Sequence, residues 1–172
     1  MAYIVVDVES DGPCPSLYSM ISFGAVLVRD PSKTFYRQLM PVSEKWIPEA
    51  LAVSGFTREE TMKFGCPKEA MKDFDKWIKE VCGDEHPIFI SDNNGFDWQF
   101  INWYFWNYLN KNPFGFSSRR IGDLYCGIVK DTFARWKHLR DTKHTHNPVD
   151  DAKGNAEVIV KLKRNYGLNI KL

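Results

Sequence analysis

The sequence has no excess of charge of either sign, because 23 lysines and arginines stand against 22 acidic residues and give a formal net charge of +1. A protein that attracted nucleic acid or a membrane through its overall field would carry a clear basic excess. Any phosphate that this chain binds must therefore be held locally, by a patch of cations or by metal ions.

Long apolar runs are also missing. The first ten residues, MAYIVVDVES, have no basic start and only a short apolar run, so they predict a β-strand rather than a signal peptide. No segment approaches the roughly 20 apolar residues that a membrane helix needs. We therefore expect a cytoplasmic protein that does not enter a membrane.

Paired cysteines, internal repeats and low-complexity segments are absent as well. The four cysteines form no CxxC pair, which favours reduced, mostly buried thiols over a zinc site or disulfides. A hydrophobic fraction of 44% over 172 residues is enough for one sizeable core. No linker composition interrupts the chain, so we expect a single domain over residues 1–172.

Apolar and β-branched runs predict the strands. A link of only three residues, 30–32, joins the second predicted strand to the third and favours an antiparallel hairpin. The strands are expected at residues 3–8, 20–29, 33–39, 87–91 and 121–124.

Helical spacing and capping residues predict the helices. Thr57 and Glu60 form a capping-box pattern, and Asn147 followed by Pro148 is typical of a helix start. Helices are expected from residue 57 for a short stretch and at 67–81, 95–109, 127–139 and 148–164. This order predicts an α/β domain in which a mixed β-sheet is flanked by α-helices.

Asp7 and Glu9 stand two positions apart at the end of the first predicted strand. Residues i and i+2 of a strand point to the same face, so both carboxylates can reach one point beyond the sheet edge. Hard cations such as Mg²⁺ prefer clustered oxygen ligands, and a cation offsets the repulsion between two carboxylates. A chain this rich in acids contains such a pair by chance, so the pair alone is not specific.

Asp97 follows the predicted strand 87–91 and opens the aromatic helix 95–109. A carboxylate in the first turn faces the preceding strand and is stabilised by the helix macrodipole. The same preference places aspartates in first turns without any function. Asp97 therefore becomes a candidate metal ligand only in combination with the other acids.

His146 and Asp151 lie in the segment HNPVDDA at the start of the predicted helix 148–164. They are about one helical turn apart and can share a site. A neutral imidazole can accept a proton from water while a neighbouring carboxylate holds a metal ion. His144 remains an alternative to His146 as the base, and Asp150 remains an alternative to Asp151 as the ligand.

These fragments, in this order, resemble the DEDDh exonucleases, the group that includes oligoribonuclease, ribonuclease T and the proofreading subunit of bacterial replicative polymerases. The segment DVES resembles the first family motif, SDNNGFDWQFI the second and HNPVDDA the third. The stretch PEALAVSGFTREE also resembles a family segment between them. The resemblance covers nearly the whole chain.

The resemblance implies a ribonuclease H-like fold and a 3′→5′ exonuclease that releases 5′-mononucleotides through a two-metal mechanism. It implies two Mg²⁺ ions, which Mn²⁺ is expected to replace, held by Asp7, Glu9, Asp97 and Asp151, with His146 as the general base. Departures from the family pattern leave these residues intact but affect substrate preference: Asp92 stands where many members have His, Ser22 where an acid is frequent, and Ser54 where His is frequent.

Substrate contacts are predicted less directly. The resemblance carries a role in holding the 3′ end over to Ser10 and Asp11, while Phe56 and Trp98 are candidates for stacking on a base, with burial in the core as the alternative. A stretch of cations leads toward His146 and can guide the phosphate backbone or form a solvated face: Lys130, Arg135, Lys137, Arg140 and Lys143.

The sequence leaves the nature of the strand open. A chain without an added binding domain suggests single-stranded 3′ ends of RNA or DNA, with RNA slightly favoured. Two rival functions are a small-nucleotide phosphohydrolase that uses the same carboxylates and a catalytically silent nucleic-acid-binding module. A third possibility is a structural α/β domain whose acids are accidental. A homodimer is expected only by analogy with compact relatives.

Overall fold

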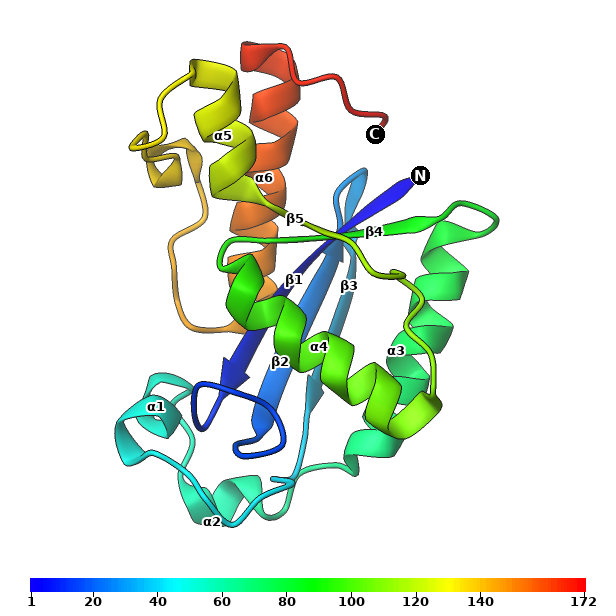
Figure 1. The fold of residues 1–172 in the computed structure, drawn as a ribbon, viewed down its shortest axis with the longest axis vertical. Helices are drawn as coiled ribbons and strands as arrows, with labels where there is room; N and C mark the ends of the chain where they lie inside the picture. The colour runs from blue at the N-terminus through cyan, green and yellow to red at the C-terminus, as the bar shows by residue number, and fades with distance from the viewer.

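A five-stranded mixed sheet runs through the centre of the molecule (Figure 1) in the computed structural model, which describes all 172 residues. The strand order is β3-β2-β1-β4-β5. The strands are β1 (Ala2–Ser10), β2 (Met20–Leu27), β3 (Asp30–Gln38), β4 (Pro87–Ser91) and β5 (Ser118–Arg120).

Strands β1, β2 and β3 form an antiparallel meander, and β4 and β5 add to it in parallel with β1. The carboxyl ends of β1, β4 and β5 therefore reach the same edge of the sheet. In the antiparallel pair, Asp7 lies opposite Gly24, and Glu9 lies opposite Ser22. This edge is where the predicted acids of the first strand meet the chain that follows β4.

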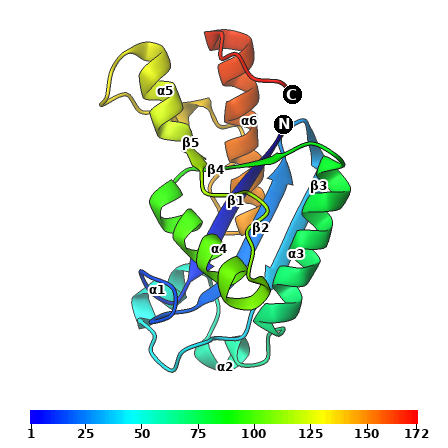
Figure 2. The same ribbon diagram turned by 45° about the vertical axis from the view of Figure 1, so that its right-hand side comes forward.

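Two helical layers cover the sheet (Figures 1 and 2), with α3 and α4 on one face and α5 and α6 on the other. Alternate residues of β1 feed the two cores: Ile4, Val6 and Val8 face α3 and α4, whereas Val5 faces α5 and α6. The helices are α1 (Pro48–Val53), α2 (Arg58–Thr61), α3 (Pro67–Cys82), α4 (Asn94–Leu109), α5 (Ile121–Val129) and α6 (Pro148–Tyr166), with a 3₁₀ turn at Lys137–Leu139.

Most predicted elements are confirmed within a few residues. Thr57 caps α2 in a complete capping box with Glu60. Asn147 caps α6 by accepting hydrogen bonds from the backbone N–H groups of Val149 and Asp150, and Pro148 occupies the first helical position. The mixed sheet flanked by helices is also as predicted. The short helix α1 was not predicted.

The predictions between residues 121 and 139 were wrong. Residues 121–124 form the first turn of α5, and the strand lies just before them, because Ile121 and Tyr125 both face the core at helical spacing. A short apolar run does not distinguish strand from helix. The predicted helix 127–139 instead stops at Val129. Lys130 then takes a left-handed conformation, and the Asp131 carboxylate accepts a hydrogen bond from the N–H of Phe133, which favours a turn over a helix.

All four cysteines are free thiols, but the prediction that most are buried was wrong, because only Cys82 is buried and Cys66 is exposed. None of the helices combines the length and the apolar character that crossing a bilayer would require.

The start of α6 rests directly on the backbone of β2 at Gly24. A Cβ atom at Gly24 would lie 2.5 Å from the carbonyl carbon of Pro148 and 2.6 Å from the nitrogen of Val149, far inside contact distance. Because these neighbours are backbone atoms, no side-chain rotation can relieve the overlap. Gly24 therefore sets how closely the first turn of α6, which carries Asp151, approaches the end of β1.

We expect Gly24→Ala to destabilise the protein by about 1–3 kcal/mol, the usual cost of forcing extra atoms into a packed interior. The variant should also lose activity in the fraction that remains folded, since it displaces the start of α6. Chemical denaturation and activity per folded molecule would measure the two effects. Gly127→Ala in α5 is the matched control, because open space surrounds its Cβ position and alanine favours a helix. A Gly24→Ala protein as stable and active as the control would contradict the proposed close contact.

Candidate active site

Carboxylates from β1 and α6 meet at the carboxyl edge of the sheet. Side-chain oxygens of Asp7, Glu9 and Asp151 all lie within 4.8 Å of one another, a spacing that suits a shared metal ion. Asp7 and Glu9 alternate with inward-facing valines along β1, so both project toward α6, as the two-residue spacing predicted. The fold thus brings together two segments that are more than 140 residues apart.

Asp97 reaches the same edge from the first turn of α4. It is 3% exposed, and its Oδ1 accepts a hydrogen bond of 3.1 Å from the backbone N–H of Val8. Since Val8 separates Asp7 from Glu9, this bond fixes Asp97 beside both. The sequence predicted that this carboxylate faces the preceding strand, 87–91, whereas its hydrogen bond joins it to the neighbouring strand β1.

Burial and mutual repulsion oppose ionisation of these acids. Burial, followed by the charges of Asp97, Glu9 and Asp151, raises the pKa of Asp7 well above its ordinary value. Burial and the charge of Asp151 raise the pKa of Glu9 to about 7. Burial and the charges of Asp92 and Glu9 raise the pKa of Asp97 to about 8. A cation is the simplest partner for such a group of acids.

Asp151 is 1% exposed, and hydrogen bonds hold its carboxylate from several sides. Oδ1 accepts from the Arg140 guanidinium at 2.9 Å and from the N–H of Thr145 at 3.2 Å. Arg140 reaches it because Gly154 in α6 has no side chain. A Cβ atom there would lie 2.6 Å from the guanidinium. Arg140 is therefore engaged with Asp151 and is not free to bind a phosphate. The prediction that Arg140 helps to guide the phosphate backbone was wrong.

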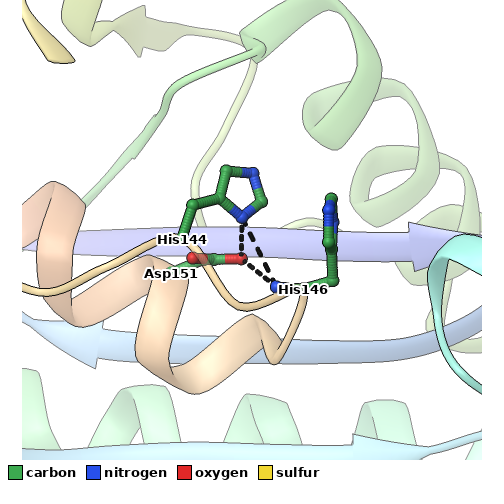
Figure 3. Close-up of side chains that lie close together, drawn as sticks. All are labelled: His144, His146 and Asp151. Carbon is green, nitrogen blue, oxygen red and sulfur yellow. Dashed lines mark hydrogen bonds and ion pairs between the residues drawn. The ribbon is translucent and has the colours of Figure 1, made fainter.

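Two histidines stand at the other oxygen of Asp151 (Figure 3). His144 Nδ1 lies 2.8 Å from Asp151 Oδ2, and the backbone N–H of His146 donates to the same oxygen at 3.0 Å. The His146 ring instead faces Glu9, with Nδ1 3.7 Å from Oε1, and its backbone is left-handed with φ 59°. The ring centroids are 4.3 Å apart. Both candidates for the base thus lie at the site.

Metal-free protein should lose stability as pH rises through the range in which these acids ionise. In the unfolded chain Asp and Glu ionise near pH 4, whereas in the folded chain the pKa is about 7 for Glu9 and about 8 for Asp97. A raised pKa in the folded state contributes stability that is present below about pH 4 and is lost by about pH 8. Burial and the charges of His146, Arg140 and Lys137 lower the pKa of His144. A lowered histidine pKa makes the folded state more stable as pH rises, so His144 opposes the effect of the acids on stability in the pH range where it titrates.

Melting temperatures measured in EDTA from pH 5 to 8.5 would test this, with Asp97→Asn as the comparison. We expect the difference in melting temperature, variant minus unaltered protein, to grow as pH rises, because only the unaltered protein must ionise Asp97. A divalent cation at pH 8 should restore stability by about 2.7 kcal/mol when present at a hundred times its dissociation constant. A difference that stays constant with pH would contradict the assigned shifts.

An apolar cavity of about 450 Å³ opens beside Glu9. Apolar side chains from α1 and α4 line much of it, and Ser10 and Gly12 form its near wall. The apolar lining consists of Pro13, Ile47, Ala50, Val53 and Phe96. Ser10 lines this cavity, and its contact with the 3′ end stays a prediction. Ile47, Val53 and Phe96 line the same cavity and were not singled out from the sequence. An aromatic residue directly before Asp97 was the only indication in the sequence.

The remaining predicted substrate contacts lie elsewhere. The Asp11 carboxylate is fully buried and forms an ion pair of 2.8 Å with Arg58, so it anchors the segment that carries α1 instead of facing the cavity. Phe56 packs edge-on against Phe64, and Trp98 packs edge-on against Phe89. None of the three lines the cavity. Trp98 packs against the core, which was the alternative to base stacking that the sequence offered.

Solved structures share this fold over almost the entire chain. The nuclease domain of 3′hExo, a DEDDh family member bound to rAMP, superposes with a TM-score of 0.78 at 18% identity, covering 99% of this chain and 96% of that one. A protein named 3′-5′ DNA exonuclease Cap18, from Escherichia coli, is 39% identical over 168 residues, which is 91% of this chain and 88% of that protein. The chain belongs to the DEDDh family of 3′→5′ exonucleases.

Two further solved nuclease structures share the fold. Cell-death related nuclease 4 superposes with a TM-score of 0.76 at 12% identity, covering 94% of this chain and 63% of that one. Exonuclease I of Escherichia coli, in a complex with single-stranded DNA, superposes with a TM-score of 0.70 at 17% identity, covering 95% of this chain and 41% of that one. No family model matches the chain.

Proposed function

We propose that this exonuclease removes 5′-mononucleotides from the 3′ ends of single-stranded nucleic acid in a reaction that depends on divalent metal ions. The observation that carries the proposal is the meeting of Asp7, Glu9 and Asp151, with Asp97 beside them, at one edge of the sheet and next to an apolar cavity. The carboxylates supply a metal site, and the cavity supplies room for a terminal nucleoside.

The donor set fits divalent cations. Carboxylate oxygens are the ligands that Mg²⁺ and Mn²⁺ prefer. The raised pKa values of Glu9 and Asp97 reflect burial and the repulsion between neighbouring acids, which a divalent cation would offset. Asp7, Glu9, Asp97 and Asp151 would hold two ions. When bound, such ions supply positive charge that activates the attacking water and stabilises the leaving 3′ oxygen.

His146 is the proposed general base. Its ring lies beside Glu9 and is about half exposed, so it can reach a water at the edge of the carboxylate group. The imidazole must be neutral to accept the proton. Asp151 orients the loop that carries this ring by accepting the backbone N–H of His146. His144 is the alternative base, although its Nδ1 is already engaged with Asp151.

The apolar cavity is proposed to hold the base and ribose of the 3′-terminal nucleotide. Its volume of about 450 Å³ falls within the range of small-ligand sites. Phe96 offers an aromatic contact, and Ile47 and Val53 cover the other wall from α1. Such contacts bind any base without selecting its sequence. A nucleoside seated here would present its 5′ phosphate toward Glu9.

DNA is the proposed substrate class. The slight preference for RNA drawn from the sequence rested on the compactness of the chain, which concerns strand length rather than the sugar. The 39% identical relative is named a DNA exonuclease, and we extend that substrate to this chain. A protein that selects RNA does so through a contact with the 2′-hydroxyl group. The experiment below therefore compares DNA with RNA of the same sequence.

The first experiment would incubate the protein with 5′-labelled single-stranded DNA and RNA of matched sequence, with Mg²⁺, Mn²⁺ or EDTA. We expect a ladder that shortens from the 3′ end in the presence of a metal ion and disappears in EDTA, with DNA shortened faster. Chromatography of the products should yield 5′-mononucleotides. Equal or faster loss of RNA would reverse the proposed sugar preference.

Two rival functions would give different products. Release of inorganic phosphate from nucleotides without any shortening of strands would identify a small-nucleotide phosphohydrolase. Strand binding without product in any metal would identify a silent binding module. Sedimentation of the same protein would test the homodimer, which stays a prediction. Cytoplasmic localisation likewise stays a prediction.

A further inference from the structure

A second cavity, of about 700 Å³, lies outside the carboxylate group. Its walls come from the turn that follows β4, from the start of α5 and from the loop that joins α5 to the 3₁₀ turn. The turn contributes Asp92 and Asn93, the residues that lead into the helix of Asp97. The reaction proposed above makes no use of this cavity.

Cations line the cavity and are only weakly engaged. Arg135 forms no ion pair, and Lys137 lies 3.1 Å from Asp92 in a pair whose lysine is 62% exposed. Arg120 pairs with the exposed Asp123. Exposed pairs of this kind contribute at most about 1 kcal/mol. Lys137 can therefore exchange its carboxylate partner for a phosphate at little cost.

An aromatic ring projects into solvent beside these cations. Phe133 is 91% exposed, and its neighbours Thr132 and Ala134 both line the cavity. Leaving such a side chain in water instead of burying it forgoes about 1.5–3 kcal/mol. Two contacts anchor the loop that carries this ring: the backbone N–H of Phe133 donates to the Asp131 carboxylate at 2.9 Å, and Trp136 at the end of the loop is buried in the core.

The loop leads from this cavity to the catalytic edge. Lys137 lines both the large cavity and a smaller one of about 220 Å³, which Arg140 and His144 also line. His144 and Arg140 both contact Asp151. In Figure 1 the yellow loop after α5 continues into the orange segment that descends to the start of α6. A strand lying along this segment would end at the carboxylates.

We propose that Phe133, Arg135 and Lys137 form an upstream subsite that binds the single strand on the 5′ side of the nucleotide being removed. Phe133 stacks on a base, while Arg135 and Lys137 hold phosphates. An exposed aromatic interleaved with cations is the chemistry that binds single strands without reading their sequence. This inference rests on the proposed function, because it assumes that a strand occupies the catalytic edge.

The test compares a long single strand of about 12 nucleotides with a dinucleotide, which is too short to occupy both sites. Phe133→Ala and Arg135→Ala should each raise KM for the long strand by about fivefold to a hundredfold, so that the preference for the long strand over the dinucleotide shrinks. Arg135→Ala should also reduce the slope of log affinity against log salt by about 0.7. Matched controls are Phe116→Ala, 88% exposed before β5, and Arg37→Ala, exposed on β3.

A long strand with abasic upstream positions provides the readout specific to stacking. The unaltered protein should bind it more weakly than the intact strand, and Phe133→Ala should not distinguish the two. The proposal is overturned if the Phe133 and Arg135 variants behave like their controls, or if they lose dinucleotide and long-strand activity equally. It is also overturned if Phe133→Ala dissociates a dimer without changing KM, which would make this surface an interface between two copies.

Binding measured by fluorescence anisotropy separates this inference from the proposed function. Strand binding that depends on Phe133, without shortening of the strand in any metal, would overturn the nuclease reaction and leave the subsite standing. Shortening with unchanged binding in both variants would overturn the subsite alone.

Discussion

Asp7→Asn should abolish nuclease activity and, at the same time, raise the melting temperature of the metal-free protein. Asp7 lies among Glu9, Asp97 and Asp151, whose charges add to burial in raising its pKa. Replacing the carboxylate with an amide removes a metal ligand worth several kcal/mol in the transition state, a loss of at least about a thousandfold. It also removes a charge that the metal-free site must otherwise bury.

Each kcal/mol gained should raise the melting temperature by about 2–4 °C for a chain of this size. The comparison is made in EDTA at pH 8, which is above the pKa of Glu9 and close to that of Asp97. Asp73→Asn on α3 is the control, since Asp73 is 52% exposed and pairs only with the exposed Arg37. Retained activity, or activity and stability lost together, would show that Asp7 is not a ligand in an electrostatically strained site.

The second large effect is expected at the histidines. His146→Asn should lower kcat by about 10²–10⁴, the range for loss of a general base, and His144→Asn should cost much less. Asn is chosen because it tolerates the left-handed backbone at His146. His144 contacts an Asp151 carboxylate that retains three other hydrogen-bond donors when this ring is removed.

Single-turnover kinetics in excess Mn²⁺ would separate a lost base from weakened metal binding. If His146 is the base, the rate falls at saturating metal and the metal dependence stays nearly unchanged. The reverse ranking, with His144→Asn the more damaging variant, would transfer the role of base to His144. This choice cannot be made from the sequence, because both histidines lie within seven residues of Asp151.

Local patterns were sufficient for most of the fold. The apolar run of β1, the capping box at Thr57 and the Asn147–Pro148 helix start all act within a few residues, so their structural consequences can be inferred from the sequence. The predictions for residues 121–124 and 127–139 were wrong because the structure of this segment depends on contacts with distant residues. Its course depends on Trp136 and Tyr125 being buried against α6, and on a side-chain turn at Asp131, which outweigh helical propensity.

The substrate side of the site depended still more on tertiary contacts. Asp11 follows the first motif in the sequence, but packing pairs it with Arg58, 47 residues away, and turns it into an anchor. The cavity wall comes instead from α1, which that anchor helps to hold near β1. Phe96 faces the cavity while Trp98 packs against Phe89, because two residues on a helix point in very different directions.

The sequence by itself determined the family resemblance, the layered α/β fold and the four acids with two candidate histidines, because these depend on residue type, order and short-range spacing. Only the tertiary structure decided that Asp7, Glu9 and Asp151 share one site, that Arg140 is committed to Asp151, and that Phe133 stands exposed beside a basic cavity. Burial, and the distance between residues far apart in the chain, are set by packing.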